Sequence, residues 1–315
     1  RAGVVMGVGV GGLDVALDQW DTYNNRGLRR VNPFLATASL CNMPAHHLSL
    51  RFQCQSYNGT VVTACASGTQ AIGEAAEAIR RGAAELMLAG GVEGMIHEVI
   101  IGGFIAMRVL ADDNEHPERA CKPFDARRDG FVSAEGTAVL VLERLDKALD
   151  RGARIYAEVL GYAANSDAFH VAAPDPEGAG AIRAMRWALE DAGVSSDTID
   201  YINAHGPGTV VGDPVETKAI KVLFGEHAYD VPISSTKSMI GHALGGAGAI
   251  EALACVKAIN EKIIHPTINY KEPDPECDLD YVPNEARPAD VRTTLSNSFG
   301  LGGQNACLVL RSFEE

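Results

Sequence analysis

Positive charge is scarce in this chain. Its 315 residues include 27 Lys and Arg against 41 Asp and Glu, which gives a formal net charge of −14. A general nucleic-acid binder needs an excess of basic residues on one face to contact phosphates, so that class is excluded. An acidic partner would have to use a local basic patch.

Long apolar runs are absent, and so is a targeting segment. No stretch approaches the length of a membrane span, and the residues from Arg1 to Met6 lack the layout of a signal peptide. We therefore expect a cytoplasmic protein with no membrane partner. Because Arg1 runs directly into an apolar strand, without a starting methionine, we also expect an amino-terminal piece to precede it.

Paired cysteine motifs are missing as well. The seven cysteines are odd in number and none are spaced as Cys-x-x-Cys, which argues against a disulfide framework and a zinc site. We expect reduced thiols at Cys41, Cys54, Cys65, Cys121, Cys255, Cys277 and Cys307.

One glycine motif invites a cofactor interpretation. Residues 7–12 fit the G-x-G-x-x-G spacing of dinucleotide-binding turns, but the polar segment after them contains no second strand ending in an acidic residue. We interpret these glycines as sites of close backbone packing instead.

Strands and helices alternate along the chain, which is long enough, at 46% hydrophobic residues, to bury a large core. This predicts a layered α/β fold with buried sheets and a boundary near residues 145–155. Apolar runs predict strands at 2–6, 85–90, 137–142, 155–160 and 199–202, and apolar periodicity predicts helices after Cys65, at 145–152 and at 177–193. A further helix is predicted to be capped by Asp213, with Pro214 first, Glu216 completing a capping box and Gly225 ending it.

Cys65 stands between the β-branched run 61–63 and the small-residue helix that Ile72 and Ile79 help to define. The partial positive charge at a helix start stabilises a thiolate and can lower the pKa of a cysteine. The position is thus compatible with a nucleophile, although on position alone a buried structural cysteine is the more frequent case.

Three more loops follow an apolar strand with polar residues flanked by Gly, Ser or Thr. They are 204–209, which contains His205; 234–242, which contains Lys237 and His242; and 296–305, which also contains Phe299. A lone histidine beside glycine is more often a structural residue than a catalyst, so neither His205 nor His242 alone predicts catalysis.

Together, in this order, the four loops resemble the elongating β-ketoacyl-acyl carrier protein synthases, and synthase II most closely. The motifs Thr-Ala-Cys-Ala-Ser-Gly around Cys65, 119–125, 128–131, 166–170 and Asn-Ser-Phe-Gly before Leu301 extend the resemblance over nearly the whole chain. It implies a thiolase-like α-β-α-β-α fold of two related halves, 1–152 and 153–315. The first half would lack its first strand and helix.

The resemblance also implies a chemistry: decarboxylative condensation of malonyl-acyl carrier protein with an acyl group held on Cys65. Backbone N–H groups of Cys65 and Phe299 would hold the oxyanion, His205 and His242 would stabilise the enolate, and Lys237 would organise the network around them. Further implied roles are a gate at Phe299, pantetheine contact by Thr209, an acyl channel lined by Val10 and Phe104, and carrier docking by Arg108, Arg127 and Arg128.

Two departures from the family pattern stand out. Pro207 replaces a threonine that would hydrogen-bond the pantetheine arm, a loss of about 0.5–1.5 kcal/mol. Leu301 replaces a phenylalanine common in synthase II, which leaves the acyl-pocket shape and the chain-length preference open.

We expect a homodimer that uses acyl carrier protein as its partner and needs neither a cofactor nor a metal. The alternatives are a polyketide ketosynthase and a non-catalytic chain-length-factor-like subunit, which loses the cysteine. A thiolase is disfavoured because no second cysteine has a glycine-rich setting.

Overall fold

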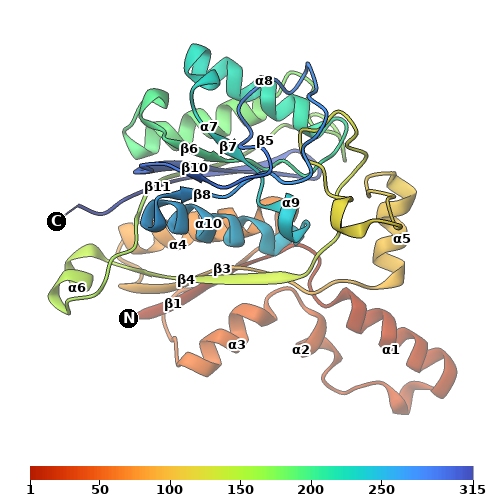
Figure 1. Ribbon diagram of the computed structural model, residues 1–315. Coiled ribbons are helices and arrows are strands. Elements are labelled where there is room, and N and C mark those ends of the chain that lie inside the picture. Colours follow the sequence, from red (N-terminus) through yellow and green to blue (C-terminus); the bar gives the residue numbers. More distant parts are fainter. Residues whose placement is uncertain (315) are drawn as a thin grey trace.

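The computed structural model describes residues 1–314, which form alternating layers of helices and sheets (Figure 1). The first sheet has the strand order β2-β1-β3-β4 and the second has β5-β11-β10-β6-β7. The strands of the first sheet are β1 (Ala2–Val8), β2 (Asn58–Val61), β3 (Leu86–Glu93) and β4 (Gly136–Glu143). Those of the second are β5 (Glu158–Ser166), β6 (Tyr201–Asn203), β7 (Ile233–Ser234), β10 (Thr293–Gly300) and β11 (Gln304–Arg311).

The two sheets repeat one pattern of strand directions. In the first, β2, β1 and β3 are parallel and β4 is antiparallel; in the second, β7, β6 and β10 are parallel and β11 is antiparallel. β5 extends the second sheet by pairing antiparallel with β11. The expected layered fold with related halves is thus confirmed, while the boundary at residue 152 stays a prediction.

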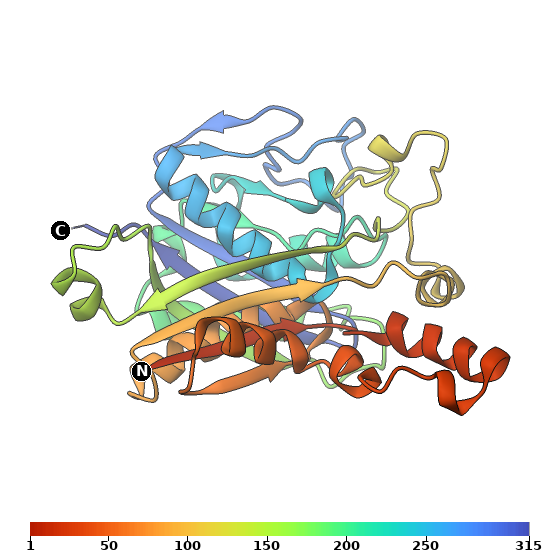
Figure 2. The ribbon, with the colours of Figure 1, turned by 90° about the horizontal axis from the view of Figure 1, so that it is seen from below.

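Helices α4 (Ser67–Arg80) and α10 (Ala247–Glu261) lie between the sheets, and α7 (Ala179–Ala192) and α8 (Gly212–Phe224) cover the outer face of the second (Figure 1). Seen from below, α1 to α3 lie beside and beneath the first sheet (Figure 2). The remaining α-helices and strands are α1 (Leu13–Arg26), α2 (Leu35–Ser39), α3 (Met43–Phe52), α5 (Glu98–Met107), α6 (Leu145–Asp150), α9 (Lys237–Ile240), β8 (Ile263–Ile264) and β9 (Arg287–Pro288). No helix within 1–314 combines the length and the apolar character needed to cross a membrane.

The two middle helices consist largely of small residues because they are enclosed by a sheet on each side. A Cβ at Gly68 would lie 2.8 Å from the backbone nitrogen of Ala249, and one at Gly248 would lie 2.1 Å from Oγ1 of Thr69. Side chains larger than hydrogen would therefore separate the helix starts. This close contact brings the Cys65 turn next to the segment that follows His242.

Most predicted elements are confirmed within about two residues. The strand expected at 155–160 is wrong in its bounds, because β5 begins only at Glu158 and runs to Ser166, opposite β11. Pairing with a strand far along the chain decides those bounds, and local sequence carries no signal for it.

Candidate active site

Cys65 lies in a 3-10 turn, η2 (Ala64–Ala66), directly before α4. Ala64 precedes it with a φ of +49°, a left-handed conformation that is strained for a residue with a Cβ. Oγ of Ser67 accepts a hydrogen bond of 2.8 Å from the backbone nitrogen of Thr63, which fixes this sharp turn between β2 and α4. The strand-turn-helix arrangement expected around Cys65 is therefore present.

The expected low pKa of Cys65 is wrong. Burial raises the pKa of the thiol, and the backbone N–H of Leu301 and the Lys237 ammonium only partly offset that effect. Desolvation exceeds the helix-start contribution because the side chain is buried. The backbone N–H that acts on the sulfur belongs to Leu301, two residues beyond Phe299. The expected oxyanion role of the Phe299 N–H therefore stays a prediction, with Leu301 as the alternative donor.

His205 follows β6 on a loop held by a carboxylate. The backbone nitrogens of His205 and Gly206 donate to Glu216 over 2.9 and 2.8 Å. Gly206 has a φ of +33°, and a Cβ there would lie 2.8 Å from the ring of Phe124, so only glycine fits. Burial lowers the pKa of His205 well below its usual range, and the charge of Lys237 adds to this.

His242 follows α9 and is held by its own backbone. Its nitrogen donates to the carbonyl of Val132 over 2.7 Å, and its carbonyl accepts from Ala134 over 3.1 Å. The imidazole packs edge-on against Phe131 with ring centroids 5.2 Å apart. Burial lowers the pKa of His242 well below its usual range, so this ring is also neutral at physiological pH.

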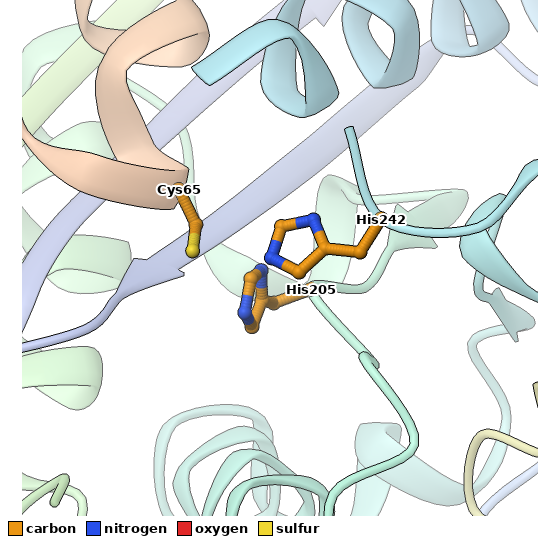
Figure 3. A group of neighbouring side chains, drawn as sticks. All are labelled: Cys65, His205 and His242. Carbon is orange, nitrogen blue, oxygen red and sulfur yellow. The ribbon is translucent and has the colours of Figure 1, made fainter. Parts of the chain in front are cut away.

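The structure brings these three side chains together, as Figure 3 shows. The sulfur of Cys65 and one nitrogen each from His205 and His242 lie within 4.8 Å of one another, and all three residues are buried. The two imidazole centroids are 5.5 Å apart at an interplanar angle of 80°. The group offers a nucleophile and two neutral imidazoles to one reacting centre. Thiolate and imidazole also ligate zinc, so the same donors could hold a metal ion.

Lys237 lies behind His205 and forms a buried ion pair with Glu251 of α10; each side chain is 1% exposed. Its Nζ donates to the carbonyl of His205 over 2.6 Å and lies 3.4 Å from Nδ1 of the same residue. Burial raises the pKa of Glu251, and the Lys237 ammonium opposes that rise. Sequence analysis missed Glu251, although a charged residue within the run 243–255 of small and apolar residues was a usable signal.

The predicted capping box at α8 is wrong. The helix begins at Gly212, and its N-cap residue Val211 makes no side-chain capping bond; Oγ1 of Thr209 instead accepts from the nitrogen of Gly212 over 3.1 Å. The Asp213 carboxylate instead accepts from the nitrogens of Phe124 and Gly208 over 2.8 and 3.1 Å, while Glu216 holds the His205 loop. Burial raises the pKa of Asp213 to about 6 and that of Glu216 to about 7. Both acids thus serve the active-site loop, because α8 packs against it.

One cavity of about 570 Å³ contains the site. Its walls include every sequence-predicted residue of the site except Lys237, Arg127 and Arg128; those on the wall are Cys65, His205, His242, Phe299, Thr209, Phe104, Val10 and Arg108. Pro207 and Leu301, the two departures from the family pattern, also face it. An edge-on contact between Phe104 and Phe131, with centroids 5.4 Å apart, continues the wall toward His242.

The three docking candidates differ. Arg108 reaches the cavity wall, and the side chain of Arg127 is 36% exposed while paired with Asp125 at 2.8 Å. The expectation for Arg128 does not fit the structure. Its side chain is only 5% exposed, forms an ion pair with Asp274 and donates to the carbonyl of Thr209 over 3.2 Å. Arg128 therefore supports the loop beside the cavity and has no free charge for a partner.

A layered fold of two related halves, with a cysteine from one half facing two histidines from the other, is the arrangement of thiolase-like condensing enzymes. The family described as "Beta-ketoacyl synthase, N-terminal domain" matches residues 1–148, and "Beta-ketoacyl synthase, C-terminal domain" matches residues 156–271. The chain belongs to the β-ketoacyl synthase family.

Comparison with individual proteins shows which members of the family this chain is similar to. The chain is 47% identical to 3-oxoacyl-[acyl-carrier-protein] synthase 2 of Synechocystis sp. and 46% identical to that of Coxiella burnetii, covering 99% and 98% of this chain and 75% of each relative. A β-ketoacyl synthase from Burkholderia phymatum superposes with a TM-score of 0.93 at 38% identity, over 100% of this chain and 76% of that one. A type II polyketide ketosynthase, solved in complex with its acyl-carrier protein, superposes with a TM-score of 0.96 at 36% sequence identity. The match covers 100% of this chain and 78% of that one. The resemblance to synthase II is thereby confirmed.

Proposed function

We propose that this chain elongates fatty acyl groups by two carbons, through decarboxylative condensation of malonyl-acyl carrier protein with an acyl group held on Cys65. The observation that carries the proposal is the buried trio of Cys65, His205 and His242 within 4.8 Å. Identity near 47% to synthase 2 relatives supports the fatty acyl substrate.

In the first half-reaction the sulfur of Cys65 attacks the acyl thioester, and the pantetheine thiol of the carrier leaves. Because burial raises the pKa of Cys65, its proton has to be removed during the attack. The proton is transferred to the leaving pantetheine sulfur, so that the carrier departs as a thiol. The N–H groups of Cys65 and Phe299, with Leu301 as the alternative to Phe299, hold the oxyanion of the tetrahedral intermediate, and one such donor contributes about 2.7–4 kcal/mol.

In the second half-reaction the bond between the malonyl carboxylate and its α-carbon breaks, and carbon dioxide leaves. The electron pair forms an enolate, whose oxygen accepts hydrogen bonds from His205 and His242. Neutral imidazoles suit this role because each retains an N–H while the lowered pKa values keep both uncharged. The α-carbon then attacks the acyl group on Cys65, and the thiolate leaves as the β-ketoacyl product forms.

Cys65→Ala tests the nucleophile. The variant removes a small side chain at a turn, so the fold should persist while acylation from an acyl carrier substrate and condensation are both lost. Peptide mapping after incubation locates the acyl group. Acylation at another of the seven cysteines, or condensation that survives in the variant, would exclude the assignment.

A polyketide ketosynthase is the second candidate, because a type II polyketide ketosynthase superposes as closely as the β-ketoacyl synthase does, with a TM-score of 0.96 against 0.93. It is placed second because this chain is only 36% identical to the polyketide ketosynthase but 47% identical to the synthase 2 relative. A non-catalytic subunit is disfavoured by the intact trio. Competition between saturated acyl and β-polyketoacyl carrier substrates for Cys65 separates the two enzymes.

We further propose acyl carrier protein as the partner, docked near Arg108 at the cavity wall, with Arg127 as a weaker contact. Arg108→Glu should raise KM for carrier-bound substrates and leave KM for a free pantetheine thioester unchanged. The homodimer stays a prediction, for which light scattering of the purified chain is the measurement.

A further inference from the structure

The glycine-rich loop 7–12 encloses a carboxylate of the protein itself. Glu93, at the end of β3, is 3% exposed and accepts hydrogen bonds from the backbone nitrogens of three consecutive residues. These are Gly9 at 2.8 Å, Val10 at 3.1 Å and Gly11 at 3.1 Å. Successive N–H groups that point inward form an anion-binding concavity, and here Glu93 occupies it. This accounts for the motif without a dinucleotide.

Glu93 also holds a second loop. The backbone nitrogen of Gly245, three residues after His242, donates to the same carboxylate over 3.0 Å. A Cβ at Gly245 would lie 2.2 Å from the nitrogen of Gly9, so the two loops touch only because both residues are glycines. One buried side chain therefore joins segments from the two halves of the fold.

Each loop carries one wall residue of the acyl channel. Val10 and Leu244 line the cavity and pack in one apolar cluster with Cys65 and Phe104. Leu244 has a φ of +39°, a strained conformation for a side chain with a Cβ. The hydrogen bond from Gly245, the next residue, to Glu93 restrains Leu244 in that conformation. Burial raises the pKa of Glu93, and the N–H donors oppose the rise.

We propose that Glu93 is a positioning residue that sets the width of the acyl channel by holding Val10 and Leu244 at a fixed separation. The inference rests on the proposed function for its substrate, a thioester-linked acyl chain. Glu93 touches neither the substrate nor the reacting atoms. It acts on which chain lengths reach Cys65 and not on decarboxylation at the two histidines.

Glu93→Gln is the decisive substitution, because it keeps the side-chain shape but turns one acceptor oxygen into an NH₂ group that faces backbone N–H donors. Acylation of Cys65 is measured with short, medium and long saturated acyl carrier substrates. The ratio of kcat/KM between long and short chains should change by about five-fold or more, because apolar pockets discriminate single methylenes by 10-fold or more. Malonyl decarboxylation should stay within about two-fold of the parent rate, since the histidines keep their supports.

Two further variants keep the test decisive. Gly9→Ala places a Cβ 2.4 Å from Oε2 of Glu93 and disturbs the same contact from the loop, so it should reproduce the altered profile. Asp200→Asn is the matched control, because Asp200 accepts from two backbone nitrogens, those of Arg292 and Thr293 at 2.9 and 2.8 Å, and none of these residues lines the cavity. Its profile should equal that of the parent.

A second probe separates this inference from the proposed function. N-alkylmaleimides of increasing chain length modify Cys65 without a carrier protein, and peptide mapping reports their rates at that residue. A chain-length dependence altered in Glu93→Gln and Gly9→Ala supports the positioning role even where no acyl carrier substrate reacts, an outcome that overturns only the proposed function. An unchanged dependence, or rates that fall equally at every length, overturns the role of Glu93.

Discussion

The Lys237–Glu251 pair permits a sharp test of how the active site is supported. Glu251→Leu removes the only acidic partner that Lys237 has within residues 1–314 and leaves its ammonium buried. Breaking a buried pair from one side costs about 3–5 kcal/mol, because the remaining charge is desolvated without compensation. The exposed pair Lys257–Glu261 on the same helix α10 is the matched control, and Glu261→Gln should leave the free energy of unfolding almost unchanged, because solvent screens that pair.

The double variant Lys237→Met, Glu251→Leu separates stability from catalysis. Two apolar side chains of similar volume leave no unpaired charge buried at this position. The carbonyl of His205, however, loses the Lys237 donor that lies 2.6 Å away. An unsatisfied buried acceptor costs about 1–3 kcal/mol, so the double variant should be more stable than Glu251→Leu alone. Decarboxylation should nevertheless remain low, because His205 has lost the group that positions it.

Urea denaturation measures the free energy of unfolding of each variant, and malonyl decarboxylation is assayed in parallel. A loss below about 1 kcal/mol in Glu251→Leu would mean that the pair behaves as an exposed one. Full decarboxylation in the double variant would show that Lys237 is dispensable for the orientation of His205. Either result would refute the role of the buried Lys237–Glu251 pair in supporting His205.

Three further predictions concern the trio and its loop. Because burial raises the pKa of Cys65, the rate of its alkylation by iodoacetamide should keep rising above the ordinary thiol pKa of about 8.5, whereas a plateau below pH 8 would indicate a stabilised thiolate. His242→Ala or His205→Ala should reduce malonyl decarboxylation far more than acylation of Cys65, and equal losses in separate assays would make that histidine a base for the thiol. Pro207→Thr should lower KM for carrier-bound substrate several-fold at unchanged kcat, as expected of a hydrogen bond of about 0.5–1.5 kcal/mol made equally in ground and transition states. An unchanged KM in steady-state kinetics would show that the loop does not contact the pantetheine arm.

The sequence alone determined the alternation of elements and the residues of the trio. Apolar periodicity and small-residue turns are local signals, so α4 and the loops of His205 and His242 were predictable from short windows. These loops share one sequence pattern, a strand followed by a polar residue among glycines, and this shared pattern indicated that they form one site. The same local reasoning misassigned Asp213 and Glu216, because a capping pattern is indistinguishable from carboxylates that face a neighbouring loop.

Only the tertiary structure decided the charge states and the supports of the site. The pKa of the Cys65 thiol depends on burial and on Leu301, Lys237 and Glu251 of the other half. Arg128 loses its docking role because it forms an ion pair with Asp274, 146 positions later. Glu93 and Gly245 are 152 positions apart. Burial and hydrogen bonding between such distant segments arise when the two halves pack, and no periodicity in the sequence records them.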